Sequence, residues 1–415
     1  MIEDRHAMKT FFEKIKQTLV PRIFRQWFKE IKRSINFIIG TGPYDLASFE
    51  YISSLAHNEE NPYGLDYPES VTGIVYQEST KSVEYQNPPV SLTQKIVSRT
   101  VANRSRFLAT GIFPEPPRII YSLFRGGVIC PQADFLIIYD VASRLAVKEV
   151  THNWYESSRN QTVFLSSQTI DTTYLEGISL SLATLGGDSF YHFFHQSLPK
   201  IFLSQHLLKS VDHFLVNGNE ERWRKKWLER SGIPLEKVIY INHRPLTHYQ
   251  CEQLLFTSSV VADAQPTKWS ISALRSLLDA HPSGQGNRWI WASRADINPA
   301  GVNRRVFAWE EELLQRFPKF EKVCFSSLSP EEVISVCRSC KVFAGPHGAA
   351  FSNLLFCNPD TLVVEFSPTT NLPPYFIRLA EVSGLNHVSV VADFEDLPEN
   401  FEKIVVALAE ILEDV

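Results

Sequence analysis

The pattern of apolar and polar positions divides the chain into three regions. Over the first 40 residues, apolar side chains recur about every four positions among basic ones, which predicts an amphipathic helix or two helices meeting at Pro21. Residues 41 to about 120 are rich in turn formers, and short β-type runs follow them. From about residue 173, strand-like apolar runs alternate with helical ones. Strands separated by helices of this length predict right-handed βαβ crossovers and a parallel sheet.

The alternation passes through two cycles. The first predicts strands at 178–185, 213–216 and 238–240, and helices at 190–208 and 222–230. The second predicts strands at 289–292, 322–325, 342–344, 362–366 and 387–391, and helices at 309–317, 330–340, 349–356 and 375–382. Residues 282–286, with the sequence Pro-Ser-Gly-Gln-Gly, contain four turn formers and are the best linker between the two cycles.

These patterns predict an α/β protein with two Rossmann-like domains. We expect an N-terminal domain over residues 41–281, with a β- and turn-rich part over 41–172 and a Rossmann-like part over 173–281. A C-terminal Rossmann-like domain is expected over residues 287–400. The basic amphipathic extension occupies residues 1–40, and a C-terminal helix occupies residues 401–415. A chain of 415 residues is long enough for two buried cores of this kind.

The charge is unevenly distributed between the extension and the rest of the chain. Residues 1–40 hold nine Lys or Arg and four Asp or Glu, although the net charge of the whole chain is -5. This balance gives no general basic surface for a nucleic acid. A basic amphipathic helix with Trp and Phe suits an anionic membrane surface. The alternative is a helix that packs on the body of the protein or on a partner subunit.

Location is inferred from targeting signals and cysteine usage. No apolar run approaches the roughly 20 residues that span a bilayer, and the N-terminus has no secretory signal pattern. Six cysteines scattered through a long chain favour reduced thiols over a disulfide framework. We therefore expect a cytoplasmic protein, held peripherally at the inner face of the plasma membrane if the extension binds lipid.

The segment from Gly345 to Asn353 is the strongest candidate for a binding site. An apolar strand runs into a tight turn containing Gly345, His347 and Gly348, and a predicted helix begins at once. Glycines let the backbone approach a ligand, and a helix start offers free N–H groups to an anion. This pattern predicts a phosphate site with His347, Gly348 and Asn353. The alternative is a plain turn in which His347 caps the helix.

Two further candidates follow other predicted strands. Glu365 interrupts an apolar run at the carboxyl end of a strand, where ligands bind in α/β sheets, and could accept hydrogen bonds from a ribose. Arg294 follows the strand at 289–292 and could clamp a diphosphate, reinforced by Arg305. The alternatives are an ion-paired Glu365 and a solvated helix start at Arg304 and Arg305.

An aromatic helix start carries candidate proton-transfer residues. Two glycines lead into Asp188, His192 and His195, and the two histidines would share one helix face. A neutral imidazole beside an acceptor hydroxyl can act as a general base, so we predict this role for His192, with Asp188 orienting or replacing it. Histidines bonded to backbone carbonyls at the edge of the core are the alternative.

Metal binding has little support in the sequence. Cys337 and Cys340 form a Cys-x-x-Cys pair without a second pair at matching spacing. The chain contains no Asp-x-Asp motif and no Walker loop. A bound diphosphate would therefore meet Arg, His and helix dipoles, and we expect neither a divalent metal nor another cofactor.

Three blocks of this sequence resemble glycosyltransferase family 61, whose bacterial members are often called capsular polysaccharide biosynthesis proteins. The blocks run from Tyr191 to Lys200, from Trp291 to Val306, and from Gly345 to Glu365, and the similarity covers roughly residues 120–395. The third block is the most specific, whereas the first 40 residues have no counterpart. The chain departs from the family pattern at Lys200, where Arg is usual, at Gln196, where an acid is common, and at Ala350, where a second Gly is usual.

The resemblance implies a GT-B architecture, with the acceptor on the N-terminal domain and the nucleotide sugar on the C-terminal one. It also implies inverting, metal-independent transfer of a sugar to a glycan or lipid-linked glycan in the synthesis of a capsular or extracellular polysaccharide. It strengthens the assignment of His192 as the base. The alternatives are a non-catalytic glycan-binding or scaffolding subunit of a polysaccharide assembly complex, and another sugar-nucleotide enzyme such as an epimerase.

Overall fold

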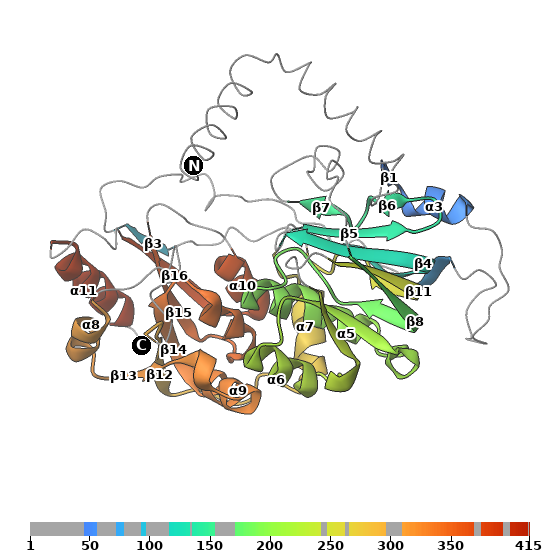
Figure 1. Ribbon diagram of the computed structural model, residues 1–415. Coiled ribbons are helices and arrows are strands. Elements are labelled where there is room, and N and C mark those ends of the chain that lie inside the picture. Colours follow the sequence, from blue (N-terminus) through green and yellow to red (C-terminus); the bar gives the residue numbers. More distant parts are fainter. Residues whose placement is uncertain are drawn as a thin grey trace, which may run out of the picture. The chain divides into compact units, whose positions relative to one another are not determined.

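The computed structural model describes most of the chain beyond the extension (Figure 1). The described residues are 45–55, 72–78, 93–96, 116–132, 135–153, 171–241, 247–261, 265–295, 309–368, 375–392, 399–413 and 415. The predicted helix at 1–40 and the predicted site residue Arg305 lie outside them. The chain divides into a first compact unit (Met1–Gly73, Ser122–Gly177 and Asn242–Leu254) and a second (Ile74–Tyr121, Ile178–Ile241 and Leu255–Val415). The domain boundary expected at 282–286 stays a prediction.

The first unit contains both antiparallel and parallel pairs of strands. It contains β1 (Asp45–Ala47), β6 (Leu145–Val147), β5 (Phe135–Asp140) and parts of β4 (Arg118–Gln132), β11 (Thr247–Thr257) and β8 (Asp171–Ser181), in that order along the sheet. The hairpin of β4 and β5 pairs Gly127 with Tyr139 and Val128 with Ile138. The short strand β7 (His152–Asn153) pairs with β5, and the unit also contains the helix α3 (Phe49–Leu55).

The second unit begins with a parallel group of strands. β8 pairs with β9 (His213–Asn217), and β9 pairs with β10 (Val238–Ile241), both in parallel. The chain between them forms α4 (Phe190–His192), the π-helix η4 (Phe193–Ser197), α5 (Leu198–Leu203) and α6 (Arg222–Arg230). These elements confirm the strands and helices predicted between 190 and 240, although β8 ends at Ser181, earlier than predicted. The strand β11 and the helix α7 (Lys268–Leu277) were not predicted.

A six-stranded parallel sheet forms the other part of the second unit. Its order is β13 (Phe320–Val323), β12 (Arg288–Ala292), β14 (Cys340–Pro346), β15 (Leu362–Pro368), β16 (Asn386–Ala392) and β3 (Thr93–Ile96). All five pairings are parallel. The first five strands confirm the predicted succession, and their order, counted from β12, is the 2-1-3-4-5 order of doubly wound folds.

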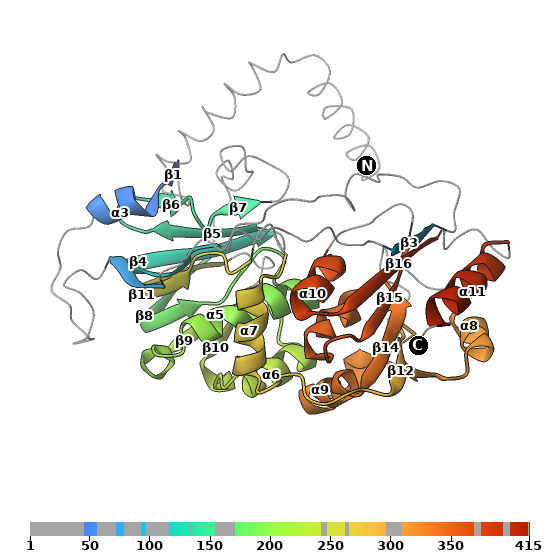
Figure 2. The ribbon, with the colours of Figure 1, turned by 180° about the vertical axis from the view of Figure 1, so that it is seen from behind.

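Helices cover both faces of this sheet, because successive side chains point to opposite faces and apolar side chains are buried on both. On one face lie α8 (Glu310–Arg316) and α11 (Glu399–Leu412) (Figures 1 and 2). They bury an apolar cluster that includes Trp291, Val364 and Phe366. On the other face lie α9 (Pro330–Arg338), η8 (Ala349–Phe356) and α10 (Tyr375–Ser383), where the ring of Phe351 packs between those of Phe343 and Phe376. The helix predicted at 349–356 is thus present, but as a 3₁₀-helix.

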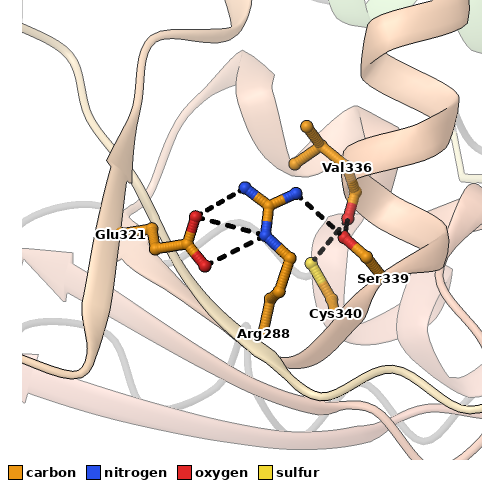
Figure 3. Close-up of polar contacts among 5 residues, drawn as sticks. All are labelled: Arg288, Glu321, Val336, Ser339 and Cys340. Atoms are coloured by element: carbon orange, nitrogen blue, oxygen red, sulfur yellow. Dashed lines mark hydrogen bonds and ion pairs between the residues drawn. The ribbon is translucent and has the colours of Figure 1, made fainter.

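The amino end of β12 is tied to its neighbours by one arginine (Figure 3). Arg288 donates from Nε to Oε1 of Glu321 at 3.0 Å and from Nη2 to Oε2 at 2.6 Å. Its Nη1 also donates to Oγ of Ser339 at 3.1 Å, just after α9. These bonds link β12 to β13 and to the entrance of β14. The carboxyl end of β12, at the opposite edge of the sheet, borders the candidate site.

The structure confirms a mixed α/β protein, with one parallel sheet of six strands and one sheet of mixed strand direction. Within the ranges described above, no helix combines the length and the apolar character needed to cross a membrane.

Candidate functional site

The site lies where the chain changes direction within the six-stranded sheet. From β12 the chain continues to β13 on one side, and from β14 it continues to β15 on the other. The carboxyl ends of two such strands leave a crevice between them, which is where ligands bind in open α/β sheets. Arg294 follows β12 and His347 follows β14, so the fold brings two of the predicted site residues to this crevice.

Glycines allow the two strand ends to approach each other. Nη1 of Arg294 donates to the carbonyl oxygen of His347 at 2.7 Å. A Cβ on Gly348 would lie 2.6 Å from that nitrogen, and a Cβ on Gly345 would lie 2.8 Å from the carbonyl oxygen of Ala292. Close backbone contact therefore requires glycine at position 345, whereas a side chain at position 348 would displace the guanidinium of Arg294.

A buried carboxylate supports the end of β12. Glu310, at the start of α8, accepts hydrogen bonds from Nε1 of Trp291 at 2.8 Å and Oγ of Ser293 at 2.6 Å. Nζ of Lys322 lies 2.8 Å from the same carboxylate. Burial alone would raise the pKa of Glu310, but these three donors outweigh burial and lower it. Glu310 thus fixes the residue that precedes Arg294, a role that no local sequence signal indicated.

Glu365 connects two imidazoles behind the crevice. Its Oε1 is hydrogen-bonded to Nδ1 of His347, and its Oε2 lies 2.8 Å from Nε2 of His387. The side chain is 1% exposed. Burial alone would raise the pKa of Glu365, but the charge of His347 and the hydrogen bonds from both histidines lower it. The predicted contact of Glu365 with a ribose stays a prediction, and the bonds observed are to His347 and His387.

Strand register explains this arrangement. Because alternate side chains share a face of a sheet, Glu365 and Val363 lie on the same side of β15. His387 of β16 is the register partner of Val363, so it lies on that side as well. His347 begins the turn after β14, and its backbone N–H donates to the carbonyl of Phe366 at 2.8 Å. Three residues distant in sequence therefore meet on one face.

His192 and His347 line the same cavity. The cavity has a volume of about 250 Å³ and belongs entirely to the second unit. It is lined by Ser189, Phe190, Tyr191, His192, Arg294, His347, Gly348, Ala349, Tyr375 and Phe376. The structure thus brings together four predicted residues, which are His192, Arg294, His347 and Gly348.

A π-helical turn positions His192. Pro199 has no N–H to donate and its ring would clash with the carbonyl of His195 in an α-helix, so a wider turn is expected before it. Accordingly, η4 spans Phe193–Ser197, and the N–H of Leu198 donates to the carbonyl of Phe193, five residues back. Such turns frequently occur at functional sites.

The imidazole of His192 is held by a chain of polar side chains. Its Nδ1 lies 2.7 Å from Nε2 of Gln196, and Oε1 of Gln196 accepts from Oγ1 of Thr184 at 2.9 Å. Gln196 and Thr184 are buried. Burial lowers the pKa of His192 to about 4. The imidazole is therefore neutral near pH 7.

The other candidate residues of the aromatic helix start do not line this cavity. His195 is fully buried, its ring centroid lies 4.9 Å from that of Tyr191, and burial lowers its pKa to about 3. The carbonyl of Asp188 accepts a hydrogen bond of 2.9 Å from Nη2 of Arg224. The structure therefore places His192, but neither His195 nor Asp188, on the cavity wall.

A second, larger cavity adjoins the first. It has a volume of about 440 Å³ and shares Phe190, Arg294 and Ala349 with the smaller one. Its other lining residues are Trp223, Lys226, Trp227, Ser293, Phe325, Ser326, Leu328, Val333, Ala350 and Asn353. Among the described residues, Oδ1 of Asn353 has no hydrogen-bond partner, while Nδ2 donates to the carbonyl of Ala350 at 2.9 Å. This cavity offers aromatic walls and a buried acceptor to a ligand.

No cluster of metal-binding side chains accompanies these cavities in the described part of the chain. There, no group of three or more His, Cys, Asp or Glu residues is arranged to hold a metal ion. Cys337 and Cys340 are buried free thiols.

Comparison with known proteins identifies one family in this region. Residues 190–364 match the family model described as Glycosyltransferase 61. The matched segment is less than half of the chain, and it contains His192, Arg294 and His347. No curated protein matches the chain. The match supports a glycosyltransferase, whose substrates are a sugar donor and an acceptor.

Proposed function

We propose that this protein is an inverting, metal-independent glycosyltransferase that moves a sugar from a nucleotide-sugar donor to a glycan acceptor in the synthesis of a capsular or extracellular polysaccharide. The observation that carries the proposal is the meeting of two cavities at Arg294, at the point where the strand order reverses. The larger cavity has the rings of Trp223, Trp227 and Phe325 in its wall, and the smaller one contains two imidazoles.

The nucleotide sugar fits this pair of cavities with its nucleoside in the larger one and its sugar in the smaller one. The nucleoside occupies the larger cavity, where aromatic walls suit a planar base and Oδ1 of Asn353 accepts a hydrogen bond from it. The diphosphate lies at Arg294 and at the start of η8, because a guanidinium provides several N–H donors in a fixed fork. The sugar then enters the smaller cavity, between His192 and His347.

Inversion follows from a single displacement at the anomeric carbon. The acceptor hydroxyl attacks from the side opposite the diphosphate and gives up its proton to a base. Oriented donors such as Arg294 stabilise the charge that develops on the leaving diphosphate. Such groups supply, in this chain, the positive charge for which other transferases use a divalent ion. The cavity provides two imidazoles for the proton transfer, and the sequence favours His192.

The strand order of the sheets and the basic N-terminal extension bear on the architecture and the location of the enzyme. The doubly wound order of the second sheet and the parallel strands β8 to β10 support a GT-B architecture. Residues 1–40 combine a periodic apolar pattern with an excess of basic side chains. This supports attachment to an anionic membrane on the cytoplasmic side, where the enzyme would meet a lipid-linked acceptor.

Nucleotide binding tests this function without knowledge of the acceptor. Uridine, cytidine, guanosine and thymidine diphosphates are titrated into the purified full chain with EDTA present, and the unfolding temperature is recorded. At least one should raise it progressively as its concentration exceeds Kd. A chain that binds no nucleotide, with or without magnesium, would instead be a glycan-binding or scaffolding subunit.

A further inference from the structure

The hydrogen bonds of the two imidazoles in the smaller cavity differ in kind. Nδ1 of His347 faces a carboxylate oxygen of Glu365, whereas Nδ1 of His192 faces the amide nitrogen of Gln196. A carboxylate can only accept a hydrogen bond, and an amide nitrogen can only donate one. The partner of one ring nitrogen decides which nitrogen of a neutral imidazole carries the proton. In the neutral state, Nε2 of His347 is therefore a hydrogen-bond acceptor, whereas Nε2 of His192 is a donor.

His347 has the tautomer that a base requires. Because Glu365 accepts from Nδ1–H, the lone pair of neutral His347 is on Nε2, and His347 is a lining residue of the cavity. Glu365 is itself held by His387 at 2.8 Å and is buried, so its orientation is fixed. A buried carboxylate behind an imidazole also stabilises the imidazolium that forms when the ring takes a proton.

His192 has the opposite tautomer. The hydroxyl of Thr184 donates to Oε1 of Gln196, which leaves the amide nitrogen of Gln196 to donate to Nδ1 of His192. The proton of the neutral ring is then on Nε2, and the ring offers an N–H rather than a lone pair. The partners in this chain of bonds are a neutral amide and a neutral hydroxyl.

We propose that His347, oriented by Glu365, is the general base of the transfer, and that His192 is a hydrogen-bond donor to the substrate in the same cavity. This assignment rests on the proposed function. Nε2 of His347 takes the proton of the acceptor hydroxyl, and the oxygen uses its electron pair to bond the anomeric carbon. The bond from that carbon to the diphosphate oxygen breaks, and its electrons leave with the nucleoside diphosphate. His347 later returns its proton to water.

The charged and titratable groups that face His347 define what a pH profile reports. Arg294, His192, Tyr191 and Tyr375 line the cavity with it, and Glu365 and His387 lie behind it. Arg294 and both tyrosines keep one charge state between pH 4 and 8. A fall of kcat/KM at acidic pH (the acidic limb of the profile) therefore reports protonation of a histidine or of the His347–Glu365 pair. Substitution of each histidine shows which group is responsible.

The experiment compares His→Gln variants of the two histidines in the full chain with an identified donor and acceptor. Glutamine keeps an N–H near the position of Nε2 but has no basic lone pair. His347→Gln should lower kcat by about 10²- to 10⁴-fold and abolish the acidic limb, while the Kd of the nucleoside diphosphate stays within about threefold. His192→Gln should retain the acidic limb and raise KM more than it lowers kcat. His281→Gln, at an exposed position, is the matched control and should match wild type.

The assignment would be overturned if the acidic limb were lost in His192→Gln and kept in His347→Gln. If His347→Gln fails to fold, ¹⁵N imidazole shifts of the wild-type chain decide instead, with His192 assigned by its disappearance in His192→Gln. Neutral His192 must then be protonated at Nε2 and neutral His347 at Nδ1, and any other pairing contradicts the assignment. A wild-type chain that transfers no sugar would count against the proposed function, whereas these shifts are measured without turnover.

Discussion

Nη1 of Arg294 donates a 2.7 Å hydrogen bond to the carbonyl oxygen of His347. This bond joins the carboxyl ends of β12 and β14, the two strands between which the strand order reverses. It also places a permanent positive charge beside the start of η8 and on the walls of both cavities. Arg294 is therefore the residue whose removal should affect the donor most.

Arg294→Ala should weaken binding of the nucleoside diphosphate by about 10- to 100-fold, since charge-assisted hydrogen bonds contribute about 1.5–3 kcal/mol. Isothermal titration calorimetry of the folded variant measures this change. Arg316→Ala is the matched control, because Arg316 forms an exposed ion pair with Glu402 and should leave Kd unchanged. Equal losses in the two variants would remove Arg294 from the donor site.

Gly348→Ala should impair the donor site with little loss of stability. The backbone at Gly348 is extended and tolerates a side chain, but the new Cβ would lie 2.6 Å from Nη1 of Arg294, which must move. We expect a weaker Kd for the nucleoside diphosphate at a nearly unchanged unfolding temperature. Gly286→Ala should behave in the opposite way, because its Cβ would meet the backbone carbonyl of Cys340. A normal Kd in Gly348→Ala would show that the guanidinium position is not critical.

Trp223→Ala tests the larger cavity as the nucleoside site. Trp223 lines that cavity and does not line the smaller one. Removal of an aromatic wall should weaken binding of a nucleoside diphosphate by about tenfold, because aromatic contacts with a base contribute about 1–3 kcal/mol. Binding of inorganic pyrophosphate, which has no base, should change little. Equal losses for both ligands would place the base elsewhere.

Buried histidines predict a loss of stability in mild acid. Burial lowers the pKa of His192 and His248 to about 4 and that of His195 to about 3, below the ordinary value of 6.5. Between these values the unfolded chain binds more protons than the folded chain, so the free energy of unfolding falls as pH decreases from about 6.5 towards 4. Urea unfolding at several pH values measures the slope.

His195→Phe should make that slope shallower, because His195 is fully buried and its replacement cannot take up a proton. His281→Phe, at an exposed position, should leave the slope as in wild type. A slope that stays the same in His195→Phe would mean that His195 does not carry the predicted proton linkage.

Much of the six-stranded sheet could be predicted from local patterns. Largely apolar runs of three to five residues marked β12 to β16, and the helix α9 begins with a capping box of Ser329 and Glu332. Arg294 and His347 could be predicted as site residues because each follows the end of one of these runs. Parallel strands place their carboxyl ends at one edge, whatever the order of the strands.

The remainder depends on pairings between distant segments. Glu365 reaches His387 only through the register of β15 and β16, and Glu310 reaches Ser293 through the packing of α8 against β12. β3 joins β16 from almost 300 residues earlier in the chain. The π-helical turn before Pro199 brings Gln196 against His192, and a helix prediction does not distinguish it from an α-helix. Such contacts leave no local pattern in the sequence.

The central claim is transfer of a sugar from a nucleotide donor at this site without a metal. The direct measurement incubates the full chain with EDTA, a panel of nucleotide sugars, and oligosaccharide or lipid-linked acceptors, and follows the nucleoside diphosphate and the anomeric configuration of the product. We predict that one donor releases its nucleoside diphosphate only when an acceptor is present, and that the new linkage has the inverted configuration. Transfer that stops in EDTA and returns with magnesium, or a product with retained configuration, would contradict it.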